Sequence, residues 1–189
     1  MDDHSSKHTD DDAEKRRMET WLQKGAERQY RQQMTQGTRL LQEHNAKEAL
    51  PLLKRAYEIQ PENADAALNL STAYLMLGQA KLAVPVLEEA TQHTTDNARL
   101  WINLGAAYLG NPVLASDEKQ TNAINAFKRA LQVDPFAPSA AYNIGLIHVD
   151  RDELEQAIAA FTLAAKSDAG DLDAKRMLKK LQGEESSSE

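Results

Sequence analysis

Apolar residues recur along most of the chain at intervals of three or four positions, the spacing of residues that share one face of an α-helix. One example is a pair of consecutive stripes, formed by Ala67, Leu70, Ala73 and Tyr74 and then by Ala83, Leu87 and Ala90. The composition agrees, because Ala, Leu, Glu, Gln and Lys are abundant while the chain has only 8 glycines and 6 prolines. The pattern therefore predicts an all-α protein.

The helical pattern repeats with a period of 34 residues. An alanine column has steps of 34, 40 and 34 residues: Ala49, Ala83, Ala123 and Ala157. A column of small residues has steps of 34, 34 and 40: Gly37, Ser71, Gly105 and Gly145. A column of large residues follows the alanine steps: Leu53, Leu87, Phe127 and Phe161. The 40-residue step falls at different places in the alanine column and in the column of small residues. Both steps are explained if six extra residues lie between Tyr108 and Ala123. Small residues next to large ones allow paired helices to pack closely.

These columns, together with the segment Trp101–Tyr108 (WINLGAAY), resemble the tetratricopeptide repeat family. The resemblance covers about 140 of the 189 residues. It implies a right-handed superhelical solenoid of antiparallel helix pairs. The repeats are expected at residues 30–63, 64–97, 98–137 and 138–171, with the six-residue insertion in the third.

The C-terminal segment 172–182 has the pattern of a single amphipathic helix, with Ala174, Leu178 and Leu181 on its apolar side. A solenoid needs a terminal element with one polar face, so we expect this helix to cap repeat 4. Residues 183–189, which are rich in Ser and Glu, are expected to be disordered.

Residues 13–29 form a basic amphipathic segment ahead of repeat 1. Its apolar stripe consists of Met18, Trp21, Leu22 and Ala26. Either a separate helix caps the N-terminal end, or the first helix of repeat 1 extends backward. Gly25 is the only weak point, which favours one long helix. The acidic residues 1–12 that precede it are expected to be disordered.

Charge and composition narrow the possible functions. The net charge of −7 argues against nucleic acid as a partner. The absence of cysteine excludes disulfides and thiolate chemistry. No secretory signal and no long apolar run is present, so a cytoplasmic protein without membrane contact is expected. No catalytic, phosphate-binding or metal-ligating motif is recognisable, so we expect no enzyme, no cofactor and no metal.

The resemblance also implies a binding groove. In this family the first helix of each repeat lines the concave face, and its sixth position points into the groove. Those positions are Thr35, Asn69, Asn103 and Asn143, and we call the three asparagines the asparagine ladder. A carboxamide offers a donor and an acceptor that match a peptide backbone. Helices about 8–10 Å apart also match about three residues of extended chain. The alternative is that these asparagines bond locally between helices.

The remaining groove positions predict an apolar surface. They are Met34, Leu41, Leu68, Leu75, Met76, Ile102, Tyr142 and Leu146. The clamp that tetratricopeptide co-chaperones use to hold a C-terminal carboxylate is not matched, because Met34 and Asn103 occupy two of its cationic positions. Of that clamp only Asn69 remains, with Arg99 in place of a lysine. The peptide-binding residues are therefore expected to be Asn69, Asn103, Asn143, Arg99, Leu68, Ile102 and Tyr142.

The sequence thus predicts a non-enzymatic interaction module, an adaptor or assembly scaffold that binds an extended peptide of another protein. The alternative is a structural protein that forms a homo-oligomer through the groove or the N-terminal helix. The insertion, within residues 110–120, is either a second contact site or a tolerated surface loop. Ser116 is expected to cap the helix that follows the insertion.

Overall fold

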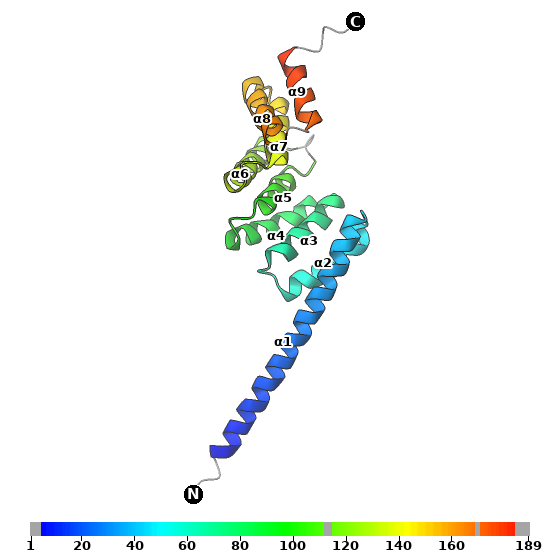
Figure 1. The fold of residues 1–189 in the computed structure, drawn as a ribbon, viewed down its shortest axis with the longest axis vertical. Helices are drawn as coiled ribbons and strands as arrows, with labels where there is room; N and C mark the ends of the chain where they lie inside the picture. Colours follow the sequence, from blue (N-terminus) through cyan, green and yellow to red (C-terminus); the bar gives the residue numbers. More distant parts are fainter. Residues whose placement is uncertain (1–4, 112–114, 169–170, 184–189) are drawn as a thin grey trace.

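A computed structural model describes residues 5–111, 115–168 and 171–183 of the chain. Within these ranges every regular element is a helix. The helices are α1 (Ser5–Gln42), α2 (Ala46–Ile59), α3 (Ala64–Met76), α4 (Ala80–His93), α5 (Ala98–Leu109), α6 (Asp117–Val133), α7 (Pro138–Asp150), α8 (Leu154–Ser167) and α9 (Leu172–Gln182). The molecule is elongated, with the free end of α1 at one extreme and α9 at the other (Figure 1).

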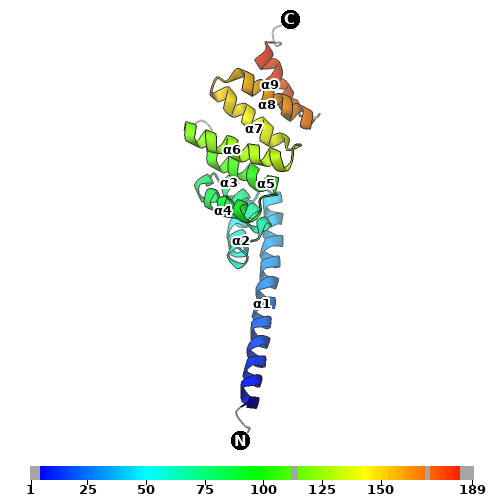
Figure 2. The same cartoon turned by 90° about the vertical axis from the view of Figure 1, so that its left-hand side faces the viewer.

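Consecutive helices pack against one another from α1 to α9, so the chain forms a stack of helix pairs (Figure 2). Helices α3, α5 and α7 begin at residues 64, 98 and 138, where the 34-residue period and the six-residue insertion place the starts of repeats 2, 3 and 4. The first helices also contact one another, α1 with α3 and α3 with α5. They form the layer on which the predicted groove lies.

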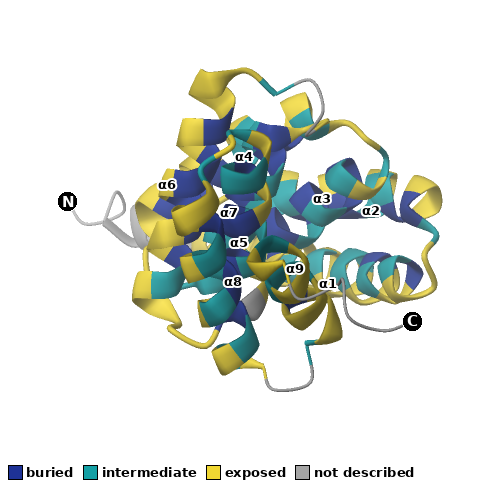
Figure 3. Ribbon diagram, turned by 90° about the horizontal axis from the view of Figure 1, so that it is seen from above, coloured by how far each residue is buried: buried dark blue, intermediate teal, exposed yellow. Residues whose placement is uncertain are grey.

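The small and large columns of the sequence meet inside the stack. A Cβ atom on Gly37 would lie 2.6 Å from Cδ2 of Leu53, and one on Gly105 would lie 2.6 Å from the ring of Phe127. One on Gly145 would lie 2.8 Å from the ring of Phe161. Glycine is therefore required for these close approaches. Figure 3 shows the buried residues inside the stack and the exposed ones around it.

The insertion in repeat 3 ends in a well-capped helix. The Ser116 side chain accepts a hydrogen bond from the Lys119 amide, as expected of an N-cap, and Asp117 and Glu118 follow in the first turn. Buried Gln120 donates from Nε2 to Asp150 at 2.5 Å and accepts from Nε of Arg151 at 2.7 Å. This network ties the start of α6 to the end of α7. Val113 and Leu114, the predicted loop tip, lie outside the described residues.

The N-terminal end of the stack differs from expectation in one respect. Residues 13–42 lie in one continuous helix, the arrangement that the sequence favours. That helix already begins at Ser5, so the expectation of disorder was wrong for residues 5–12.

At the C-terminal end, α9 spans the residues predicted for the capping helix and packs on α8. Its Ala174 is fully buried with Ala141 and Ala164.

Candidate peptide-binding groove

Two residues of the asparagine ladder make the same contact one repeat apart. Nδ2 of Asn69 donates a hydrogen bond to Oγ1 of Thr38 at 2.9 Å. Nδ2 of Asn103 donates to Oγ1 of Thr72 at 3.0 Å. Each threonine belongs to the preceding first helix and lies 31 residues before its asparagine. The two threonines are 34 residues apart, so the repeat period alone relates them. Neither threonine, however, was assigned a role from the sequence.

The surrounding hydroxyls fix the orientation of the Asn103 carboxamide. The Thr72 and Ser71 hydroxyls both donate to the Leu68 carbonyl, each at 2.8 Å. Their oxygens are therefore left as acceptors. Both lie within reach of Nδ2 of Asn103, Ser71 at 3.4 Å. The amide nitrogen must face these hydroxyls, and the carbonyl oxygen Oδ1 faces away from them.

The acceptor side of both amides is unused within the described part of the chain. Oδ1 of Asn69 and Oδ1 of Asn103 accept no hydrogen bond there, and both side chains are only partly buried. The local bond between helices, which the sequence left as an alternative, thus occupies the donor side alone. Asn103 therefore holds one oriented acceptor, and Asn69 makes the matching contact with its Oδ1 likewise unpaired.

Asn143 is not equivalent to the other two. Its Nδ2 donates to the Ser139 carbonyl of its own helix at 2.7 Å. The reason is visible in the preceding repeat, where Ala106 stands at the position of Thr38 and Thr72 and offers no hydroxyl. In repeat 1 the corresponding groove position is Thr35, which is exposed. The ladder therefore has two matching members, Asn69 and Asn103, rather than three.

The apolar groove positions divide into exposed and buried residues. Leu68 is only 3% exposed and belongs to the core, so its assignment to the groove surface was wrong. Position 68 lies on α3, which is covered by neighbours on both sides. Met76 and Leu146 are exposed, as is Arg99. Ile102 is partly buried and packs against the core.

Tyr142 lies in a partly buried setting near the C-terminal cap. Its ring meets that of Phe161 edge to face, with centroids 5.3 Å apart. Burial, with Asp173 and Asp171 nearby, raises the pKa of its phenol above the ordinary value. The hydroxyl therefore stays protonated at neutral pH and is able to donate a hydrogen bond.

Two further features are absent from the described residues. They contain no group of three or more His, Asp or Glu side chains that could hold a metal ion. None of the described helices is long and apolar enough to cross a membrane.

Comparison with known sequences identifies the family. Two family profiles, both described as tetratricopeptide repeat, match residues 40–107 and 113–171, which together make up more than half of the chain. The chain therefore belongs to the tetratricopeptide repeat family. No curated protein sequence matches it significantly.

Several solved structures share the fold. PilF from Pseudomonas aeruginosa has a TM-score of 0.71 and 23% identity, covering 85% of this chain and 71% of that one. A crystal structure of MamA has a TM-score of 0.66 and 25% identity, covering 78% and 84%. YrrB, described as a TPR protein with an unusual peptide-binding site, has a TM-score of 0.64 and 23% identity, covering 76% and 71%. These similarities support the fold, a helical solenoid of repeats.

Proposed function

We propose that this protein holds an extended segment of a partner protein along the layer of first helices, as an adaptor or assembly scaffold. The observation that supports the proposal most is the pair of matching carboxamides at Asn69 and Asn103. Each has its amide nitrogen held by a threonine of the preceding repeat and its Oδ1 left open. An acceptor fixed in advance loses little freedom on binding, which favours affinity.

The two carboxamides suit the backbone of a peptide rather than one particular sequence. Each Oδ1 would accept a hydrogen bond from a backbone N–H of the ligand. First helices packed about 8–10 Å apart would place the two contacts about three residues apart in an extended chain. Each threonine takes one of the two N–H donors of its asparagine, so the open Oδ1 accepts from an N–H of the ligand and the second N–H of Nδ2 can donate to a ligand carbonyl.

Neighbouring side chains would supply selectivity. Met76 and Leu146 are exposed apolar residues on α3 and α7, and Arg99 is an exposed cation on α5. Methionine adapts to ligands of different shape, and Arg99 favours a carboxylate on the ligand. We therefore expect ligands with apolar side chains and an acidic residue, bound in extended form. The insertion of repeat 3 is either a second contact site or a tolerated surface loop.

The experiment selects peptides of about twelve residues from a displayed random library and measures their affinity by calorimetry. Asn103→Ala should weaken binding by about 1–3 kcal/mol, because it leaves a ligand N–H without its partner. Thr72→Val should weaken it less, since Asn103 remains but loses its orientation. Asn125→Ala, which removes an exposed asparagine on the second helix of repeat 3, is the matched control. Full affinity of a folded Asn103→Ala variant would refute the proposal.

A further inference from the structure

The N-terminal half of α1 projects from the stack, and the end of α2, at Ile59 and Gln60, lies near its base (Figures 1 and 2). Every residue from 14 to 26 is exposed. The exposed residues include three large apolar side chains, Met18 (56%), Trp21 (70%) and Leu22 (56%). An isolated helix carrying such side chains is marginal in water unless a partner covers it.

These side chains belong to a face that continues along repeat 1. At 3.6 residues per turn, Met18, Trp21 and Leu22 share a face with Gly25, followed by Arg28 and Gln32. Arg28 and Gln32 are also exposed, because no described helix covers this side of α1. A second helix could therefore lie along this face over several turns.

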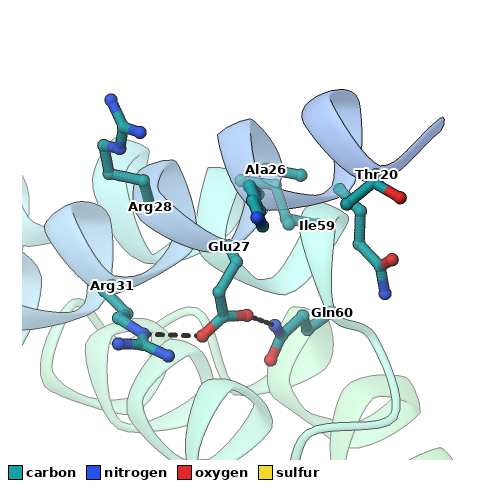
Figure 4. Close-up of a pocket in the computed structure, with 9 residues that line it drawn as sticks. Thr20, Ala26, Glu27, Arg28, Arg31, Ile59 and Gln60 are labelled. Atoms are coloured by element: carbon teal, nitrogen blue, oxygen red, sulfur yellow. Dashed lines mark hydrogen bonds and ion pairs between the residues drawn. The ribbon is translucent and has the colours of Figure 1, made fainter. Parts of the chain in front are cut away.

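The charges on this helix change sign along its length. Residues 10–14 contain four acidic residues, Lys15, Arg16 and Arg17 follow them, and Lys24, Arg28 and Arg31 lie toward the stack. The carboxylate of Glu27, the acidic residue among those cations, is already bound by Arg31 at 2.6 Å and by Gln60 at 2.7 Å (Figure 4). Arg28 points away from it and has no ion-pair partner among the described residues.

We propose that the occupant of this face is a second copy of the chain, paired antiparallel about Trp21. Glu14 and Arg28 each lie seven residues from Trp21. An antiparallel pair therefore places Glu14 of each copy opposite Arg28 of the other, with the apolar side chains together at the two-fold axis. A parallel pair would oppose like charges at both positions. Such an isologous contact closes at the dimer.

The first test measures the mass of the full chain by analytical ultracentrifugation, without ligand, over a range of protein and salt concentrations. The wild type should form a dimer that dissociates on dilution and at high salt. Trp21→Ala should raise the dimer dissociation constant about tenfold or more. Glu14→Arg and Arg28→Glu should each weaken the dimer, and an equimolar mixture of the two variants should restore it. A wild type that stays monomeric at every concentration overturns the proposal.

The second test fixes the direction of pairing and uses the absence of cysteine in the chain. Oxidation of a mixture of Glu14→Cys and Arg28→Cys should give a disulfide-linked heterodimer. Glu14→Cys alone should not link, because two copies of position 14 would lie about 21 Å apart along the paired helices. Linkage of Glu14→Cys with itself, or failure of the mixture to link, overturns the antiparallel pairing. Circular dichroism checks that each variant is folded.

Discussion

The repeat stack and the projecting half of α1 are both helical, yet different forces hold them. In the stack, each helix is fixed by tight contacts such as that between Gly105 and Phe127. In the projecting half, Gly25 has no atom within 4 Å of where a Cβ would lie, and residues 14–26 are exposed. The helices of the stack are thus stabilised by packing. The projecting half of α1 depends instead on the helix propensity of its residues and on whatever covers its apolar face.

This comparison predicts that the same substitution has opposite effects in the two regions. Gly105→Ala adds a methyl group 2.6 Å from the ring of Phe127, which is fully buried in the core. We expect a loss of about 2–3 kcal/mol and a fall in melting temperature of about 5–10 °C. Thermal and urea denaturation followed by circular dichroism measure it. A melting temperature equal to that of the wild type would show that the repeated small and large residues do not control how the helices pack.

The two ends of the molecule should also respond differently to truncation. Deleting residues 172–189 removes α9 and exposes Ala141 and Ala164, which Ala174 covers. Leu163 is already 40% exposed with α9 in place, so the face that α9 protects is the alanine face. We expect the melting temperature to fall by about 3–6 °C.

Deletion of residues 1–12 is the control for that truncation, because it shortens only the projecting helix. It should leave the melting temperature of the stack unchanged. Equal effects of the two deletions would contradict the assignment of α9 as a cap.

The smallest effect is expected in the projection. Gly25→Ala replaces a poor helix former by the best one, with free space around it. It should stabilise the helix locally by about 0.5–1 kcal/mol and raise helical content without moving the melting temperature of the stack. The ellipticity at 222 nm, recorded at low protein concentration, measures this. A destabilised stack would mean that the projection packs against it.

The sequence predicted the stack well because its columns report packing directly. Gly105 and Phe127 recur in register with their counterparts, and the structure brings them together. The start of α1 was missed because the acidic residues 5–12 have a composition typical of disorder. Asp11 and Asp12 precede Lys15 and Arg16 by four residues, a spacing that favours a helix.

The groove was harder to predict because it depends on neighbours from other repeats. Leu68 is adjacent to Asn69 in sequence, but the helices packed on both sides of α3 bury it. Asn143 matches the other asparagines in register, yet Ala106 leaves it without the hydroxyl that Thr38 and Thr72 provide. The environment of a repeated residue is therefore set by the repeat before it.

The most direct test of the peptide-binding account is a backbone N-methyl scan of a selected peptide, with the affinity for the wild-type protein measured by calorimetry. Methylation removes one N–H donor and leaves the side chains unchanged. If Asn69 and Asn103 bind the ligand backbone, two methylated positions about three residues apart should lose affinity by about 1–3 kcal/mol each. The loss at one of them should disappear in the Asn103→Ala variant. Affinity that depends on side chains alone, and not on any backbone N–H, would contradict the account.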